Sequence, residues 1–252
     1  MNEYVKDLNR IEFIITNACT GRCKHCSQSN HINSMQSVRC ADAQRAVEDI
    51  AGQYNITSLM TFGGEPLLFS DTVCAVHKTA SRIGISKRQL ITNGFFSKDG
   101  NVIKAVAKNV VESGINDILL SVDAFHQETI PLEYVKRFAE ALKSNGGAVR
   151  LQPAWLVSID DENPYNIETK KVLEEFSYLN IPVGQGNVIF PEGNALLYLR
   201  EYFSDGKEYK NPYDEDVMHL TSVSIEPDGT MLRKSIYTQS AVEILDLYTP
   251  SE

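Results

Sequence analysis

Several features are absent from this sequence of 252 residues, and each absence excludes or disfavours a class of function. It has no run of about 18 apolar residues, the length that a membrane-spanning helix needs. Basic residues are fewer than acidic ones, 24 against 33, so the formal net charge is −9 at pH 7. Because phosphate backbones select Lys and Arg, this deficit argues against a nucleic-acid ligand. The polar, acidic segment from Met1 to Asp7 differs from a signal peptide, so we expect a cytoplasmic protein.

Cysteine is scarce as well, with five residues in the chain and none after Cys74. Three of the five lie close together, at Cys19, Cys23 and Cys26. In a reducing compartment, clustered thiols are typical of a metal site rather than of a disulfide framework. Three thiolates leave one iron of a [4Fe–4S] cluster without a protein ligand. A metal with an open coordination position can react, so this motif predicts a reactive metal centre.

Apolar, β-branched stretches alternate with amphipathic stretches over most of the chain. The apolar stretches predict strands at 11–16, 58–62, 88–92, 117–122, 149–157 and 182–190. The amphipathic stretches predict helices at 41–54, 71–83, 102–113, 133–144, 167–179 and 195–203. Near-continuous Val, Ile and Leu runs suit parallel strands that are covered on both faces. The spacing therefore predicts an α/β protein with a parallel sheet, either a curled barrel or an open sheet.

Distinctive residues follow three of the predicted strands. They are Gly63, Gly64, Glu65 and Pro66 after the second strand, Asn93 after the third, and Ser121 and Asp123 at the end of the fourth. Glycine has no Cβ atom, so a ligand can approach the backbone closely at Gly63 and Gly64. Ser121 and Asp123 alternate along the strand, which turns both side chains the same way. Active sites of barrel folds lie at the C-terminal ends of their strands, so these residues are candidates for a binding site.

With these motifs in this order, residues 9–200 resemble the radical S-adenosylmethionine (SAM) superfamily. The resemblance rests on Cys19, Cys23, Cys26, Gly63 to Pro66, Thr92 to Gly94, Ser121 and Asp123. It implies a partial (β/α)6 TIM barrel whose three cysteines hold one [4Fe–4S] cluster, with SAM at the open iron. One electron from the cluster would then cleave SAM to a 5′-deoxyadenosyl radical, which abstracts hydrogen from a substrate. An electron donor such as flavodoxin or ferredoxin is implied as well.

The resemblance also implies roles for the residues around the cluster. Gly63, Gly64, Glu65 and Pro66 would meet the methionyl amine of SAM, and Asn93, Ser121 and Asp123 would bind its ribose and carboxylate. His25 stands where the family usually has an aromatic residue before the third cysteine. Both a binding role and a packing role stay open for His126, Arg150 and Gln152. Cys40 is either a buried apolar residue or a thiol that donates hydrogen. Cys74 lies in a predicted helix and is interpreted as a buried apolar residue.

The C-terminal part, residues 204–252, is predicted to be a linker at 204–216 and a β-hairpin that turns at Pro227-Asp228-Gly229. The barrel would then span residues 1–203. Residues 190–195 and 224–232 resemble the tail of SPASM-type enzymes, which modify peptides. Such tails carry cysteines for auxiliary clusters, whereas Arg233, Lys234 and Ser235 stand at the corresponding place here. We therefore expect a tail without a cluster, a ribosomally made peptide as substrate, and room for a peptide-recognition partner protein.

Alternatives remain for both the substrate and the class of protein. The substrate could be a small molecule or a nucleotide. The chain could instead be a catalytically silent iron–sulfur scaffold, although a scaffold has no need of the Gly63 to Pro66 and Ser121-x-Asp123 motifs. A structural zinc site could also form from the three cysteines with His25, His31 or Cys40.

Overall fold

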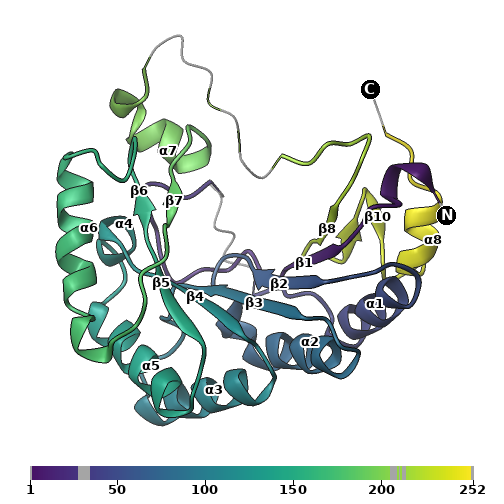
Figure 1. Cartoon of the computed structure of the whole chain (residues 1–252), viewed down its shortest axis with the longest axis horizontal. Helices are drawn as coiled ribbons and strands as arrows, with labels where there is room; N and C mark the ends of the chain where they lie inside the picture. The colour runs from purple at the N-terminus through teal and green to yellow at the C-terminus, as the bar shows by residue number, and fades with distance from the viewer. Residues whose placement is uncertain (1, 28–34, 205–208, 210, 212–213, 251–252) are drawn as a thin grey trace.

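The computed structural model describes residues 2–27, 35–204, 209, 211 and 214–250. Six parallel strands form one sheet that curls into an arc, with helices on its outer side (Figure 1). In the order of the sheet, the strands are β5 (Val149–Gln152), β4 (Asp117–Ser121), β3 (Lys87–Thr92), β2 (Ser58–Phe62), β1 (Arg10–Ile14) and β8 (Ser222–Ile225). This arrangement confirms the α/β fold with a partial barrel.

The outer face of the sheet packs against the long helices. These are α1 (Cys40–Gln53), α2 (Ser70–Arg82), α3 (Gly100–Glu112), α5 (Leu132–Ser144) and α6 (Pro164–Glu174), close to the helices that the sequence predicts. Alternation along β1 shows how the two faces of the sheet differ. Ile11 and Phe13 are fully buried in the core. The residues that alternate with them, Arg10, Glu12 and Ile14, stay partly exposed on the inner face.

Shorter elements complete the part of the chain that the structure describes. They are η1 (Glu3–Val5), η2 (Pro66–Phe69), α4 (Ala124–Gln127), β6 (Ala154–Trp155), η3 (Ser177–Leu179), β7 (Asn187–Val188), α7 (Gly193–Tyr198), η4 (Arg200–Tyr202), β9 (Thr230–Met231), β10 (Lys234–Ser235) and α8 (Ala241–Asp246). Among the described residues, the structure contains no helix with the length and apolarity that a membrane crossing requires.

The second half of the barrel departs from the predicted strands. The strand predicted at 149–157 is divided at Pro153, which has no N–H group for a β-ladder, into β5 and β6. The strand predicted at 182–190 is reduced to a bridge between Leu151 and Val183 and to β7, which pairs with β6. A narrow two-stranded ribbon therefore continues the arc beyond β5, in place of a full sixth strand at this end.

The sixth strand of the sheet comes from the C-terminal part. β8 pairs in parallel with β1, Val223 beside Ile11 and Ile225 beside Phe13, so residues 222–225 join the barrel rather than the predicted hairpin. The hairpin forms later, between β9 and β10. The predicted turn is present, since Gly229 N donates to Glu226 O at 2.9 Å, but it links β8 to β9. The predicted linker at 204–216 lies partly outside the described residues, and the domain boundary at residue 203 stays a prediction.

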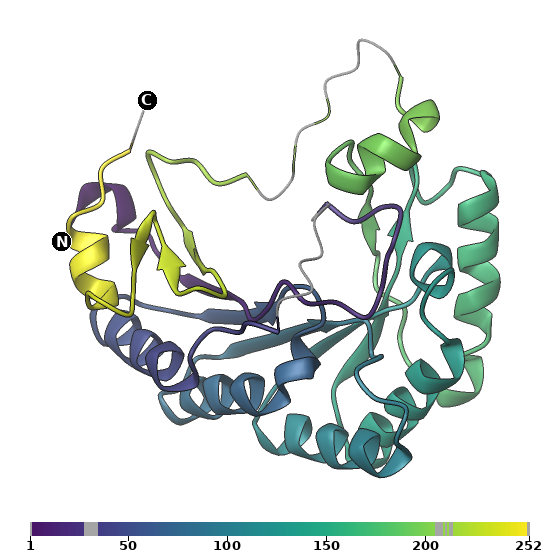
Figure 2. The ribbon, with the colours of Figure 1, turned by 180° about the vertical axis from the view of Figure 1, so that it is seen from behind.

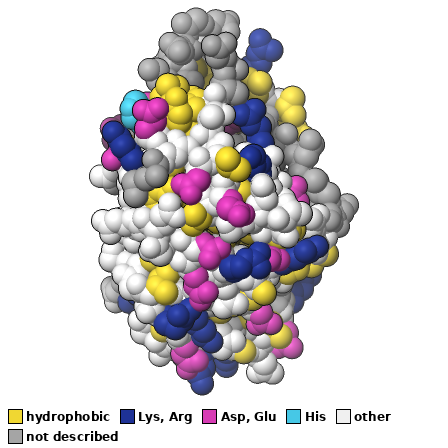
Figure 3. All heavy atoms as spheres, turned by 90° about the vertical axis from the view of Figure 1, so that its right-hand side faces the viewer, with side chains coloured by type: hydrophobic (Ala, Val, Ile, Leu, Met, Phe, Trp, Pro, Cys, Tyr) yellow, Lys and Arg dark blue, Asp and Glu magenta, His cyan; other side chains and the backbone are white. Residues whose placement is uncertain are grey.

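The two ends of the described chain lie side by side (Figure 2). The side chain of Asn2 donates to Leu245 O at 3.0 Å and to Tyr248 O at 2.6 Å, which ties η1 to the end of α8. On the face that carries these ends, basic and acidic side chains are interspersed among the residues coloured in Figure 3. The tail is therefore fixed to the barrel next to β1.

Candidate active site

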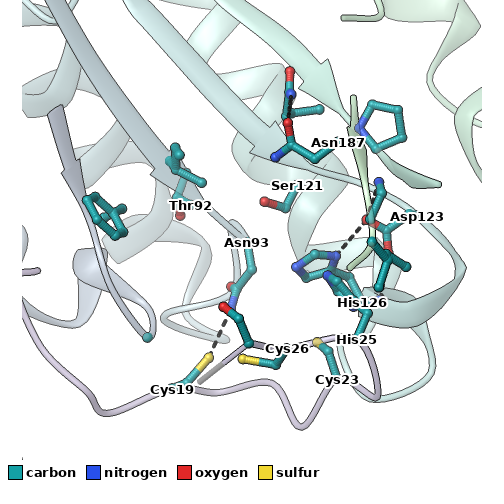
Figure 4. Close-up of a pocket in the computed structure, with 18 of the residues that line it drawn as sticks. Cys19, Cys23, His25, Cys26, Thr92, Asn93, Ser121, Asp123, His126 and Asn187 are labelled. Carbon is teal, nitrogen blue, oxygen red and sulfur yellow. Dashed lines mark hydrogen bonds and ion pairs between the residues drawn. The ribbon is translucent and has the colours of Figure 1, made fainter. Parts of the chain in front are cut away.

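A pocket of about 280 Å³ lies on the inner face of the sheet, at the C-terminal ends of its strands (Figure 4). The last residues of four neighbouring strands form one wall: Ile14, Phe62, Thr92 and Ser121. The loop after β1 forms another wall and brings Cys19, Cys23 and Cys26 to the same space. The predicted cysteine motif and the predicted strand ends thus meet at one site.

Two asparagines hold the loop that carries the cysteines. Asn93, which follows β3, donates from Nδ2 to Cys19 Sγ at 3.6 Å and to Thr20 Oγ1 at 3.2 Å. Asn194, in α7, donates from its backbone N to Cys26 O at 2.9 Å and from Nδ2 to Cys23 O at 3.1 Å. These bonds fix the loop from two sides, so the positions of the thiols depend on segments far away in the sequence.

Burial controls the protonation of the thiols. It raises the pKa of Cys19 to about 11, and it also raises the pKa of Cys23, next to the negative charge of Asp123. Both groups are therefore neutral thiols at pH 7 when no cation is near. Thiolates are the forms that bind metals, and the positive charge of a bound metal stabilises them. Three soft donors that converge on one pocket wall fit an iron–sulfur cluster.

The structure gives the glycines after β2 a different role from close approach to a ligand. A Cβ atom on Gly63 would lie 2.5 Å from Thr16 O, and one on Gly64 would lie 2.1 Å from Ala18 O. Gly64 N donates to Thr16 O at 2.7 Å. Glycine at these positions lets the end of β2 lie against the backbone that leads into the cysteine loop. Both glycines also line the pocket, and their contact with SAM stays a prediction.

Glu65 is fully buried, and neither it nor Pro66 is among the described residues that line the pocket. Its carboxylate accepts hydrogen bonds from Thr92 Oγ1 at 2.7 Å, Asn93 N at 2.8 Å and Leu67 N at 2.9 Å. Burial raises the pKa of Glu65 to about 7, against the effect of these three donors. The side chain therefore connects the end of β2 with the end of β3 and positions Asn93 from behind the wall. The predicted contact of Glu65 and Pro66 with SAM is untested.

Asp123 touches the pocket, but protein donors occupy both of its carboxylate oxygens. Oδ1 accepts from His126 N at 2.9 Å, and Oδ2 accepts from His126 Nδ1 at 2.8 Å and from Ala154 N at 3.1 Å. Burial alone would raise the pKa of Asp123, but the His126 ring and N–H outweigh it and hold the pKa at about 2. The polar groups that this strand end presents to the pocket thus include Ser121 and His126.

The ring of His25 packs against the rings of two residues of α4, Phe125 and His126. Its ring centroid lies 5.0 Å from that of Phe125 and 4.8 Å from that of His126. Burial lowers the pKa of His25 to about 4, so the ring is neutral at pH 7. Its Nδ1 is buried and has no hydrogen-bond partner among the residues described.

One wall of the pocket was not predicted from the sequence. It consists of the segment from Asn187 to Phe190, together with Pro153 and Ala154. Gln152 also lines the pocket. Arg150 instead donates hydrogen bonds to Asp117 at 2.8 Å and to Gln152 at 2.9 Å, which fits the packing role within the barrel. Cys40 and Cys74 lie in α1 and α2, away from the pocket wall. The apolar run from Val188 to Phe190 was the available signal, but it did not show which side of the pocket this run reaches.

Comparison with protein families settles the membership of the chain. The model of the radical SAM superfamily matches residues 13–152, more than half of the sequence. The chain belongs to the radical SAM superfamily. Its cofactors are accordingly a [4Fe–4S] cluster and SAM, and the convergent thiols are the matching donor set.

Curated relatives are distant. A GTP 3′,8-cyclase of Moorella thermoacetica is 23% identical over 127 residues, which cover 50% of this chain and 38% of the relative. A GTP 3′,8-cyclase of Thermodesulfovibrio yellowstonii is 20% identical, over 90% of this chain and 70% of the relative. A pre-heme d1 synthase of Dinoroseobacter shibae is 30% identical, over 43% of this chain and 25% of the relative. The chain thus matches less than half the length of two of these three relatives.

Solved structures extend the likeness to nearly the whole chain. Streptococcus suis SuiB bound to the precursor peptide SuiA superposes with a TM-score of 0.56 at 12% identity, over 98% of this chain and 62% of that one. BtrN in complex with AdoMet and 2-DOIA superposes with a TM-score of 0.53 at 14% identity, over 97% and 84%. At such identities, the likeness shows the fold alone.

Proposed function

We propose that this radical SAM enzyme abstracts hydrogen from a ribosomally made peptide. The observation that supports catalysis most directly is the convergence of three thiols and four strand ends on one pocket. When bound, the cluster and SAM supply one-electron cleavage of a carbon–sulfur bond and a group that abstracts hydrogen. In this proposal the chain needs no second cluster, since the sequence has no cysteine after Cys74.

Different residues of the pocket would hold the cluster, bind SAM and exclude water. Cys19, Cys23 and Cys26 hold the cluster, and Asn93 fixes the first of them. Ser121 offers a hydroxyl for a ribose or carboxylate group. Apolar strand ends such as Ile14 and Phe62 keep water away from the site, which protects a reactive intermediate from side reactions.

Charges on the inner face of the barrel support a substrate without a polyphosphate. Alternate residues of a strand share a face, so Arg10 and Glu12 lie on the same face as the pocket residue Ile14. Arg10 is paired with Glu12 at 2.6 Å, and Arg150 on β5 is paired with Asp117 at 2.8 Å. A nucleoside triphosphate carries several negative charges and selects cations that are available to it. Neither arginine lines the pocket, and none of the described residues that do line it is Lys or Arg, which supports a peptide over a nucleotide.

A small-molecule substrate is the second candidate. It is favoured by the names of the two GTP 3′,8-cyclases, which act on GTP according to those names, and by the modest volume of the pocket. The tail supports the peptide instead, through its resemblance to SPASM-type enzymes and through a fold shared with SuiB, which was solved with its precursor peptide.

Isotope transfer from the substrate tests this proposal. The reduced, cluster-loaded enzyme is incubated with SAM and with short peptides encoded next to its gene, each deuterated in one residue type. Deuterium in the 5′-deoxyadenosine product identifies a substrate and the residue that is attacked. Transfer from a nucleotide or another small molecule, with none from any peptide, would replace the peptide assignment. A loaded protein that never forms 5′-deoxyadenosine would instead be a scaffold.

A further inference from the structure

A second set of metal donors overlaps the cysteine motif. The donor atoms of Cys23, His25 and His126 all lie within 4.8 Å of one another. Only Cys23 belongs to the three cluster ligands, and the two imidazoles come from the cysteine loop and from α4. One thiolate and two imidazoles form a donor set that suits a borderline cation such as Zn²⁺.

His126 is oriented as a metal-binding histidine is. Its Nδ1 lies 2.8 Å from Asp123 Oδ2, and since a carboxylate accepts, this nitrogen carries the proton. The lone pair is then on Nε2, the ring nitrogen on the side away from Asp123 in Figure 4. A carboxylate behind a histidine is the usual outer partner of a metal ligand, and Asp123 is itself fixed by Ala154 N at 3.1 Å.

His25 supplies the second imidazole. Its Nδ1 is buried without a hydrogen-bond partner in the described structure, although buried polar atoms normally have one. The packing of its ring against Phe125 and His126 restricts its orientation. A metal ion beside this nitrogen would supply the partner that it lacks.

We propose that the cluster-free protein binds one Zn²⁺ through Cys23, His25 and His126, with water as the remaining ligand. Binding displaces the proton of the Cys23 thiol, and each imidazole binds through a nitrogen that carries no proton. The thiolate leaves one positive charge on the site, and the buried carboxylate of Asp123 balances it. Cys19 stays outside the site, held by Asn93 Nδ2 at 3.6 Å and by Gly21 N at 3.3 Å.

This site would regulate cofactor loading. Zinc and the cluster both require the Cys23 thiolate, so occupancy by one excludes the other. That consequence rests on the proposed assignment of Cys23 to the cluster, whereas the zinc site itself does not. The two claims therefore separate: zinc binding is measured without iron, and competition is measured by adding iron and sulfide to the zinc-loaded protein.

The test uses Co²⁺ as a coloured substitute for Zn²⁺ in the full-length, cluster-free protein under anaerobic conditions. The wild type should bind one Co²⁺ with a thiolate charge-transfer band and visible bands typical of four-coordination, and Zn²⁺ should displace it. A Cys19→Ala/Cys26→Ala double variant should keep this spectrum and affinity. Asp123→Asn should weaken Co²⁺ binding about 10- to 100-fold, and His126→Gln, which removes a ligand, should weaken it at least as much.

The chain offers a matched control in His219, an exposed histidine that lies 3.3 Å from Asp216 in the same i, i+3 arrangement. His219→Gln should bind Co²⁺ as the wild type does. Circular dichroism confirms that each variant is folded. Loss of Co²⁺ in the double variant with no loss in His126→Gln would show a three-thiol site and overturn the proposal. A wild type that binds no Co²⁺ would overturn it too.

Discussion

The side-chain amide of Asn93 donates a hydrogen bond to the thiol of Cys19, with 3.6 Å between Nδ2 and Sγ. The backbone N–H of the same residue donates to the buried carboxylate of Glu65 at 2.8 Å. The end of β2, the end of β3 and the cysteine loop are thus joined through one residue. This connection explains how motifs that are far apart in the sequence reach a common geometry.

Replacing Asn93 should loosen the cysteine loop. Asn93→Ala removes the bonds to Cys19 and Thr20, and also the acceptor for Phe95 N at 2.8 Å. We expect the free energy of unfolding to fall by about 1–2 kcal/mol and the reconstituted cluster to lose iron to a chelator faster than the wild type. Denaturant titration and iron release measure the two effects. Asn101→Ala, at an exposed position in α3, is the control, and equal behaviour of both variants would contradict the role of Asn93.

Replacing the carboxyl group of Glu65 should destabilise the fold. Glu65→Gln places an amide group among three hydrogen-bond donors, so at least one buried donor loses its acceptor. The expected loss is about 1–3 kcal/mol in the free energy of unfolding. The same change at Glu48, an exposed residue of α1, should stay within about 0.5 kcal/mol of the wild type. Similar stabilities for the two variants would show that Glu65 is not a structural link.

A Cβ atom at Gly64 should displace the cysteine loop. In Gly64→Ala the new methyl group would lie 2.1 Å from Ala18 O, so the backbone before Cys19 must move. We expect lower iron content after reconstitution as well as weaker SAM binding. Gly52→Ala is the matched control, since its Cβ meets no atom within 4 Å and alanine favours the helix. Full iron content with weak SAM binding would instead support a direct contact between Gly64 and SAM.

Stability should decrease on mild acidification because of His77. Burial lowers the pKa of this residue to about 3, and its Nε2 lies 2.9 Å from Thr61 Oγ1 between β2 and α2. The unfolded chain binds a proton near pH 6.5, so between pH 6.5 and 3 the unfolded state holds one more proton than the folded state. The contribution of His77 to stability should therefore fall as the pH drops, by up to about 1.4 kcal/mol per pH unit, whereas Glu65, with its raised pKa, contributes in the opposite direction. Urea titrations of the cluster-free protein from pH 7.5 to 5 should show a shallower decline for His77→Asn, and parallel curves would contradict this origin.

The sequence predicted the strands from β1 to β4 and the helices around them because each is a short apolar run or an amphipathic stretch between clear turns. It did not predict where β8 pairs. Ser222, Val223, Ser224 and Ile225 alternate as a hairpin strand does, and the same alternation suits an edge strand whose one face is buried. The choice depends on packing against β1, which no local pattern contains.

The site shows the same limit. Residue type and order correctly predicted that the cysteines, the glycines and Asp123 lie at the C-terminal end of the barrel strands. The direction of a side chain after a strand ends depends on the loop conformation, so the burial of Glu65 and the pairing of Asp123 with His126 could not be predicted. The contacts that Asn194 makes with the cysteine loop depend on tertiary structure in the same way.

The most direct test of the central claim combines metal analysis with product analysis on one anaerobically reconstituted sample. The account predicts about four irons and four sulfides per chain, and SAM cleavage to 5′-deoxyadenosine once the cluster is reduced. Both should be absent in the Cys19→Ala/Cys23→Ala/Cys26→Ala variant. Iron near eight per chain would contradict a single cluster, and a protein that binds zinc but no iron under these conditions would contradict the account as a whole.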